Sequence, residues 1–324
     1  QPVRINAVYQ GNPAVDQWST ASNTNTVLNY FGPNGCAYIP ATPQELGGFE
    51  GGTPQQVNDA LNAGSFMLQH RDHGFEQGWG EPGYTSSNIS GLTNVGKLSY
   101  IMSVNCLTGK YNYSSEVFAE KFHRYTYNNQ YAGAVGILAA SEVSYSFVND
   151  AFVWGMYDNM WPEFLPSYGA LFEERDLMPA FGMCAGKIFL QQSSWPYNSG
   201  DKEVTYNLFH CHGDAFLDVY SEVPQQLTVS HNEVMLSGLS TFDVTANEGA
   251  FIALTANGQI IGTGFGTGNP VAIPVNTPAI GTTVKIVVTK QNYYRHTSSV
   301  VVISPENPYV ITSGVSVNDP SGNN

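Results

Sequence analysis

Two patterns of apolar and polar residues follow one another along this chain. In residues 1 to 224, apolar runs of strand length alternate with segments of helical period. This alternation is typical of βαβ units and predicts a mostly parallel sheet flanked by helices. From residue 225 to residue 304 the chain is rich in Val, Thr and Ile, has frequent turn signals and shows no helical period, which predicts an all-β sandwich.

Local signals mark particular elements within each part. A helix is expected to begin after Thr53, which can form a capping box with Gln56, and to end at Gly64. The pair Asn257-Gly258 lies between two apolar runs and is the signal of a tight hairpin. We therefore expect an α/β unit over residues 1–224, a β-sandwich of immunoglobulin type over 225–304, and a linker or tail rich in Pro, Asn, Ser and Gly over 305–324.

Two apolar runs end in residues that can do chemistry. The first run, residues 65–73, ends at His73, and the second run, residues 98–106, ends at Cys106. If both runs are parallel strands of one sheet, their carboxyl ends lie on the same edge, which is where open α/β sheets place their sites. We therefore expect His73 and Cys106 to lie side by side. His70 is a strand residue and the rival candidate for a base.

A thiol beside an imidazole is a candidate nucleophile with its general base. The thiolate of Cys106 would attack a carbonyl carbon, and His73 would take the thiol proton and later give it to the leaving amine. The tetrahedral intermediate also needs donors for its oxyanion. The backbone N–H of Gly74, which no side chain covers, and the N–H of Cys106 are the candidates.

The sequence around both residues resembles a known family. The segment His73-Gly74-Phe75-Glu76-Gln77-Gly78-Trp79 resembles the HGSETAW-like segment of the gingipains, clan CD cysteine endopeptidases with a caspase-like fold. The segments 92–94, 105–109 and 209–214 are also similar to gingipain segments, and the interval between residues 73 and 106 is typical of the family. The resemblance is greatest to the lysine-specific members. It implies a caspase-like α/β unit, an immunoglobulin-like sandwich after it, and cysteine endopeptidase activity on polypeptide substrates.

The resemblance also assigns roles outside the Cys-His pair. Gingipains orient the histidine with an acidic residue upstream, after an early strand, and Asp16 fits that place. Trp79 is expected to line the substrate pocket, because it follows the histidine loop closely. The gingipain catalytic unit has two caspase-like subdomains, and this chain resembles only the second. We expect the first to be a separate N-terminal chain or subdomain of the same precursor, or to be absent, and the start at Gln1 directly before a strand-like run suggests a processed product.

The pocket for the substrate side chain resembles that of the gingipains less closely. The arginine- and lysine-specific members place an Asp there, and the matching places in this chain are residues 22–25 and Ser144. Glu142 lies two positions from Ser144, so on a strand the two would share a face and Glu142 could substitute for the missing acid. Asp150 is a further candidate. A basic P1 side chain needs such a charge partner, so a trypsin-like specificity is a hypothesis.

Composition limits the classes of binding partner and the cellular locations that the protein can have. The net charge is −14, with 12 Lys and Arg, which argues against nucleic acid or an anionic membrane as a partner. No apolar segment approaches the roughly 20 residues that span a bilayer. Only 12% of the residues are charged, and this polar but uncharged surface, together with the resemblance, suggests a secreted protein or one on a bacterial cell surface.

Cysteine and histidine positions give weak support to disulfides and metal sites. If the compartment is oxidising, one bridge could form among Cys36, Cys184 and Cys211, and the sequence does not choose it. His210 and His212 share a strand face, but no matching ligand cluster stands at a suitable spacing. The resemblance implies a structural Ca2+ ion, which the acidic balance favours, with ligands that the sequence does not identify.

We therefore expect a secreted gingipain-like cysteine endopeptidase that works through Cys106 and His73. Two other functions stay open. A gingipain-like sortase or transpeptidase of a secretion system would use the same residues and pass the acyl group to an amine in place of water. A degenerate adhesin would explain the altered HGFEQGW loop and the missing pocket acid.

Overall fold

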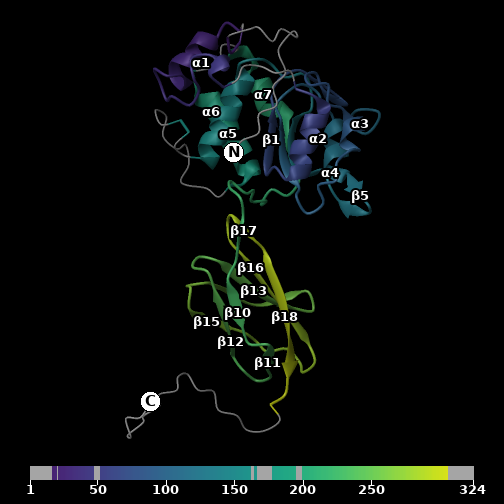
Figure 1. Ribbon diagram of the computed structural model, residues 1–324, viewed down its shortest axis with the longest axis vertical. Helices are drawn as coiled ribbons and strands as arrows, with labels where there is room; N and C mark the ends of the chain where they lie inside the picture. Colours follow the sequence, from purple (N-terminus) through teal and green to yellow (C-terminus); the bar gives the residue numbers. More distant parts are fainter. Residues whose placement is uncertain are drawn as a thin grey trace. The chain divides into compact units, whose positions relative to one another are not determined.

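The computed structural model describes residues 17–19, 21–46, 52–161, 164–165, 177–194 and 199–305. The chain forms two compact units, Gln1–Ser221 and Glu222–Asn324 (Figure 1). Each unit has a hydrophobic core of its own. The strand expected at residues 3–9 and the tail expected at 306–324 lie outside the described residues.

Unit 1 is built on a four-stranded sheet with the order β1-β4-β7-β8. The strands are β1 (Met67–His70), β4 (Ser99–Ser103), β7 (Ala134–Ala140) and β8 (Phe209–His212). The pairs β1/β4 and β4/β7 are parallel, whereas β8 runs antiparallel to β7. The mostly parallel sheet expected from the sequence is confirmed.

Helices cover both faces of this sheet (Figure 1). The α-helices are α1 (Thr24–Phe31), α2 (Pro54–Ala63), α3 (Ser86–Ile89), α4 (Phe118–Arg124), α5 (Val148–Met160), α6 (Pro179–Gln192) and α7 (Lys202–Leu208). The short elements are the 3₁₀ turns η2 (Pro43–Leu46) and η3 (Ser199–Asp201), and the strand pairs β2 (Gly74–Phe75) with β3 (Gly78–Trp79) and β5 (Thr126–Tyr127) with β6 (Gln130–Tyr131).

The alternation of side chains along β4 separates two hydrophobic cores. Tyr100 and Met102 face a core that they share with Phe31 of α1, with α5 and α6, and with Phe209 of β8. Ile101 faces the opposite core, which it shares with residues of α2, α3 and α4. A sheet buried on both faces leaves its strand ends as the place where polar side chains can meet.

The helix α2 has the ends that its sequence predicts. The Thr53 side chain accepts a hydrogen bond from the Gln56 backbone N–H at 3.3 Å, and the Gln56 side chain accepts one from the Thr53 N–H at 2.9 Å. Gly64 ends the helix at a φ of 105°, a conformation that only glycine adopts at little cost. The helix therefore delivers the chain directly to β1 and to the residues that follow it.

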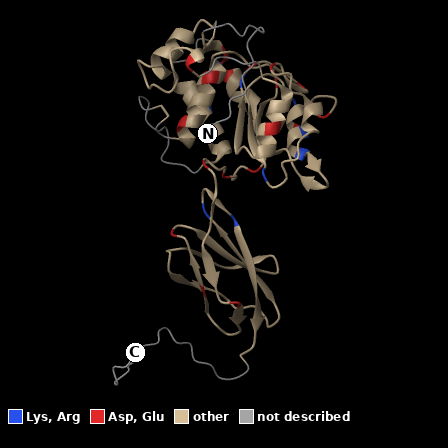
Figure 2. Ribbon diagram, in the orientation of Figure 1, with Lys and Arg blue, Asp and Glu red and all other residues tan. Residues whose placement is uncertain are grey.

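Basic residues of unit 1 gather near α4 and β5 (Figure 2). Lys121 and Arg124 of α4 lie 3.8 and 3.7 Å from the carboxylate of Glu116. Exposed ion pairs of this kind contribute little to stability, but the carboxylate offsets part of the local positive charge.

Unit 2 consists of β-strands in two main sheets around one core. A three-stranded sheet has the order β10-β12-β15, and a five-stranded sheet has the order β11-β18-β16-β13-β14. The strands are β9 (Gln225–Gln226), β10 (Val229–His231), β11 (Val234–Leu236), β12 (Thr241–Ala246), β13 (Phe251–Ala256), β14 (Gln259–Phe265), β15 (Pro270–Pro274), β16 (Thr283–Thr289), β17 (Tyr293–Tyr294) and β18 (His296–Ile303). Asn257 and Gly258 form the expected two-residue turn between β13 and β14, both with positive φ.

None of the described helices is both long enough and apolar enough to cross a membrane.

Candidate active site

The ends of β1 and β4 bring the His73 loop and the Cys106 loop together. The two strands pair in parallel from Met67 opposite Tyr100 to His70 opposite Ser103, so their carboxyl ends coincide. His73 follows β1 and is exposed, and Cys106 follows β4 and is half-buried. The expectation that both loops leave one edge of the same sheet is confirmed.

Gly74 lies against the peptide that carries Cys106. A Cβ atom placed on Gly74 would lie 2.5 Å from Oδ1 of Asn105 and 2.7 Å from the backbone oxygen of Cys106. With contacts this short, any side chain at position 74 would force the two segments to shift apart. The histidine loop and the cysteine loop are therefore in direct contact, and glycine is what allows it.

The hairpin of β2 and β3 turns the Gly74 N–H outward. His73 and Gly80 form a hydrogen-bonded pair, in which the Gly80 N–H donates to the His73 oxygen at 2.9 Å. Gly74 is the next residue and lies opposite Trp79, so it belongs to a non-hydrogen-bonded pair, because the two kinds alternate along an antiparallel ladder. Its N–H consequently points away from β3.

The backbone N–H of Cys106 also donates no hydrogen bond to another described residue. Among the hydrogen bonds that the described residues make, none uses this N–H as donor. The Cys106 oxygen, by contrast, accepts from the Thr108 N–H at 2.8 Å. The N–H groups of Gly74 and Cys106 are thus two donors on adjoining segments that both remain available to an oxyanion.

The loop after β7 covers the Cys106 sulfur. The Ser144 N–H donates to Sγ at 3.4 Å, and the Ser144 Oγ lies 3.8 Å from the same sulfur. The Ser144 Oγ itself accepts from Nδ2 of Asn149 at 2.9 Å. A second tie joins the two loops, because the Leu107 N–H donates to the Glu142 oxygen at 3.2 Å. An N–H donor aimed at sulfur stabilises negative charge on it.

His70 is held in the fold and cannot serve as the base. Its ring is buried and stacks on Trp79, with ring centroids 4.3 Å apart. Nε2 bonds to the Glu81 oxygen at 2.9 Å, and Nδ1 bonds to Nδ2 of Asn105 at 2.8 Å. Burial lowers the pKa of His70 to about 4, so the ring is neutral at ordinary pH. The exposed His73 is therefore the better candidate of the two.

Trp79 is a core residue, and its predicted place in the substrate pocket is wrong. Its side chain is 1% exposed and packs against Tyr84, Phe118 and Phe122. The indole Nε1 donates to the Ser103 Oγ at 2.8 Å, which satisfies its polar atom inside the core. The position of Trp79 close to His73 in the sequence does not reveal that the hairpin turns its side chain into the core.

The acidic candidates for the substrate pocket both have cationic partners. Glu142 follows β7 on a bend, so its predicted strand face shared with Ser144 is wrong. Its exposed carboxylate bonds Lys110 at 2.5 Å, and this hydrogen bond lowers the pKa of the Glu142 carboxyl group. Asp150, in the first turn of α5, accepts from Nε of Arg71 at 3.0 Å. Asp16 lies outside the described residues.

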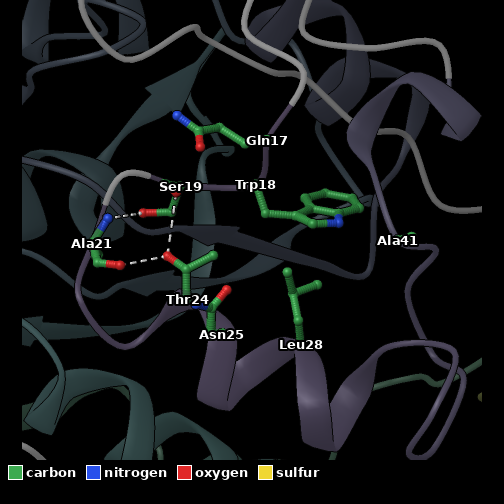
Figure 3. A pocket seen from close by; sticks show the side chains of 8 residues that line it. All are labelled: Gln17, Trp18, Ser19, Ala21, Thr24, Asn25, Leu28 and Ala41. Carbon is green, nitrogen blue, oxygen red and sulfur yellow. Dashed lines mark hydrogen bonds between the residues drawn. The ribbon is translucent and has the colours of Figure 1, made fainter.

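A pocket at the start of α1 includes part of the segment 22–25 (Figure 3). Its volume is about 270 Å³, and it is lined by Gln17, Trp18, Ser19, Ala21, Thr24, Asn25, Leu28 and Ala41. The Thr24 hydroxyl donates to the Ala21 oxygen at 2.7 Å, and the Ala21 N–H donates to the Ser19 hydroxyl at 3.0 Å. The lining mixes polar and apolar residues and carries no charged side chain, and none of it comes from the loops of Cys106, His73 or Ser144.

The remaining cysteines and histidines form no further site among the described residues. Cys36, Cys184 and Cys211 are free thiols. His210 and His212 lie on β8 with ring centroids 4.6 Å apart, and the Nε2 of His210 donates to the Gly109 oxygen at 3.1 Å. In the part of the chain that the structure describes, no group of three or more His, Cys, Asp or Glu side chains is placed to hold a metal ion.

Comparison with known proteins places this site in a family. The family model described as peptidase family C25 matches residues 5–220. The chain belongs to peptidase family C25. The resemblance to gingipains is thereby confirmed, and the match covers the unit that holds Cys106 and His73.

The C25 relatives include gingipains of both specificities. Gingipain R2 of Porphyromonas gingivalis is 25% identical over 215 residues, which are 66% of this chain and 28% of the relative. Lys-gingipain W83 of the same species is 24% identical over 259 residues, which are 77% of this chain and 15% of the relative. The chain therefore spans less than a third of the length of these relatives.

Solved structures show the same fold in the C25 family. The crystal structure of the arginine-specific cysteine proteinase gingipain R matches with a TM-score of 0.63 and 22% identity, over 77% of this chain and 56% of that chain. A complex of the pro- and mature domains of a Porphyromonas gingivalis gingipain matches with a TM-score of 0.62, 21% identity, and coverage of 77% and 57%. The caspase-like fold of unit 1, a mixed sheet between helices, is confirmed.

Proposed function

We propose that this chain is a cysteine endopeptidase of peptidase family C25 in which Cys106 is the nucleophile and His73 the general base. The observation that carries the proposal is the contact between the two loops, where Gly74 lies against the peptide of Cys106. Family membership supports the reaction type, and gingipain R, whose structure matches, is a cysteine proteinase.

Acylation would follow from the groups at this sheet edge. The Cys106 thiol passes its proton to His73, and its sulfur forms a bond to the scissile carbonyl carbon. The carbonyl oxygen becomes an oxyanion, which the N–H groups of Gly74 and Cys106 would stabilise, because the Gly74 N–H points away from β3 and no hydrogen bond among the described residues uses the Cys106 N–H. His73 then gives its proton to the leaving amine as the C–N bond breaks.

Deacylation would reverse these roles with water as the nucleophile. His73 takes a proton from water, the hydroxide oxygen bonds to the acyl carbon, and the same two N–H groups hold the second oxyanion. The C–S bond then breaks and the sulfur leaves as thiolate, which recovers the proton. The exposed position of His73 allows water to reach it.

Asp16 would orient His73 in this scheme. This part of the proposal rests on the resemblance to the gingipains, which use an acidic residue in that place. A carboxylate that accepts from one imidazole nitrogen fixes the tautomer, so that the other nitrogen can accept the thiol proton.

Ser144 would lie on the side of the pocket that receives the P1 side chain. Its backbone and hydroxyl both contact the Cys106 sulfur, so a substrate bound at that sulfur passes close to it. Glu142 and Asp150 already form ion pairs with Lys110 and Arg71, which makes them weaker charge partners for a basic P1 residue. We infer that neither residue supplies a trypsin-like specificity.

Further parts of the proposal rest on the family resemblance. Unit 2 has two sheets around one core, which supports an immunoglobulin-like sandwich. Polypeptides would be the substrates, secretion or display on the bacterial surface the location, and a separate N-terminal chain or subdomain a partner. The described residues offer no His, Cys, Asp and Glu cluster that fits the Ca2+ ion, so that ion stays a prediction.

The test is cleavage of a peptide library by the purified chain, with and without an added primary amine. We expect wild-type protein to cleave peptides in water alone, and pretreatment with iodoacetamide to abolish the cleavage. Products that carry the amine and require it would favour a transpeptidase. A chain that cleaves nothing and whose Cys106 does not react with iodoacetamide would support the adhesin alternative and refute this proposal.

A further inference from the structure

A chain of buried polar side chains lies directly beneath the two loops. It consists of Trp79, Ser103, Thr108, Asn105 and His70, each of which is at most 7% exposed. These residues come from the end of β1, the end of β4 with the loop that follows it, and the hairpin of β2 and β3. Burying five polar groups is costly unless all are hydrogen-bonded, so their arrangement is expected to be specific. We call this group the buried polar chain.

Hydrogen bonds join the members of the buried polar chain from Trp79 to His70. The Trp79 Nε1 donates to the Ser103 hydroxyl at 2.8 Å, and the hydroxyls of Ser103 and Thr108 are 2.9 Å apart. The Thr108 hydroxyl donates to Oδ1 of Asn105 at 2.9 Å, and Nδ2 of Asn105 donates to Nδ1 of His70 at 2.8 Å. Nε2 of His70 then lies 2.9 Å from the Glu81 oxygen.

The ends of the buried polar chain fix the direction of its outer bonds. An indole N–H only donates and a backbone carbonyl only accepts, so Ser103 accepts from Trp79 and His70 donates through Nε2. The Ser103 hydroxyl lies 2.9 Å from the Thr108 hydroxyl and can also donate to Oδ1 of Asn105 at 3.2 Å. A neutral His70 then has an unprotonated Nδ1 that accepts from Asn105. Burial, which lowers its pKa to about 4, keeps it in this form.

Asn105 connects the buried polar chain to both proposed oxyanion donors. It directly precedes Cys106, so the orientation of its carboxamide constrains the peptide that holds the Cys106 N–H. Its Oδ1 is also the atom against which Gly74 lies, because a Cβ on Gly74 would come within 2.5 Å of it. The Asn105 side chain and the Cys106 oxygen, which would lie 2.7 Å from the same Cβ, thus together set how closely the Gly74 and Cys106 backbones approach.

We propose that Asn105 and His70 are positioning residues that hold the N–H groups of Gly74 and Cys106 at the spacing an oxyanion needs. This inference rests on the proposed endopeptidase function. Neither side chain touches a reacting atom in the scheme; both act through the backbone of the two loops.

Replacing Asn105 by Ala is expected to lower kcat by about 10- to 100-fold with KM changed less than about threefold, because oxyanion contacts strengthen in the transition state. Alkylation of Cys106 by iodoacetamide displaces iodide from carbon and forms no oxyanion. Its rate, measured by peptide mapping because Cys184 is also exposed, is expected to stay within about twofold of wild type. A purely structural lesion would lower both rates.

A pair of substitutions at His70 tests the direction of the hydrogen bonds. His70→Gln can accept from Asn105 with its carboxamide oxygen and donate to the Glu81 oxygen with its nitrogen, so it is expected to keep most of kcat. His70→Leu keeps the bulk but neither bond, and it is expected to match Asn105→Ala.

Thr108→Val removes one hydroxyl at nearly constant shape, and a loss of about three- to tenfold in kcat is expected even if Asn105→Ala does not fold.

Asn94→Ala is the matched control. Asn94 is as deeply buried as Asn105, and its carboxamide bonds the backbone of Gly133 in both directions, at 2.8 and 2.7 Å. This variant is expected to unfold at lower denaturant concentration while kcat stays at the wild-type value.

The outcomes separate this inference from the proposed function. Wild-type protein that cleaves peptides, together with an Asn105→Ala variant of unchanged kcat, would overturn the inference alone. So would equal losses in cleavage and alkylation, or a His70→Gln variant no better than His70→Leu. Wild-type protein that cleaves no peptide refutes the proposed function, and the inference falls with it.

Discussion

Substituting Cys106 by Ala is expected to lower kcat/KM for peptide cleavage by about 10⁴-fold or more, to the background of the assay. The sulfur forms the covalent bond in the proposed scheme, and no other thiol contacts Ser144 or follows β4. Cleavage is measured by mass spectrometry on a peptide that the wild-type protein cuts. The side chain is small and half-buried, so the variant is expected to fold like the wild type.

Cys184→Ala is the control for this substitution. Cys184 is an exposed thiol in α6, outside the loops that form the site, and its removal is expected to leave kcat/KM unchanged. Cleavage that persists in the Cys106→Ala protein would show that another group is the nucleophile.

Replacing Gly74 by Ala is expected to lower kcat/KM by about 10²- to 10³-fold. The added methyl group would lie 2.5 Å from Oδ1 of Asn105 and 2.7 Å from the Cys106 oxygen, and the second of these atoms is backbone. The two loops must then separate, which moves the Gly74 N–H away from the Cys106 N–H. Steady-state kinetics measure the loss of kcat/KM, and the change in Tm measures how far the substitution destabilises the fold.

Gly83→Ala is the matched control in the segment that follows the hairpin. A Cβ on Gly83 meets only the Gly80 oxygen, at an ordinary 3.9 Å, so the same chemical change there is expected to leave kcat/KM within about twofold of wild type. A Gly74→Ala protein with wild-type kinetics would mean that the contact between the loops does not set the oxyanion site.

The elements that the sequence predicts well are those with local causes. The capping box of Thr53 and Gln56, the stop at Gly64 and the turn at Asn257-Gly258 each depend on a few adjacent residues, and each is found in the structure. The two apolar runs, and the rule that parallel strands share an edge, also predict that the loops of His73 and Cys106 leave the sheet on the same side.

The features that the sequence could not predict depend on contacts between distant segments. Trp79 is buried because its hairpin folds onto α4, and nothing near it in sequence indicates that direction. Glu142 is paired because Lys110 reaches it from the loop after Cys106. The role of His70 was open until burial and two hydrogen bonds showed that it is neutral and fully engaged.

The buried polar chain could be found in part from sequence. Ser103 ends a strand buried on both faces, and Asn105 and Thr108 follow in the next loop, which already suggests that these polar residues need partners inside the fold. Their partners, His70 and Trp79, come from another strand and from a hairpin, so the connections themselves require the structure.

The most direct test of the account is to trap the acyl-enzyme and locate it. Wild-type protein is mixed with a cleaved peptide or its ester, quenched with acid at early times, digested and mapped by mass spectrometry. We predict an adduct with the mass of the acyl half of the substrate on the peptide that contains Cys106, lost in Cys106→Ala. An adduct on any other residue, or turnover with an acyl group that never reaches Cys106, would contradict the account.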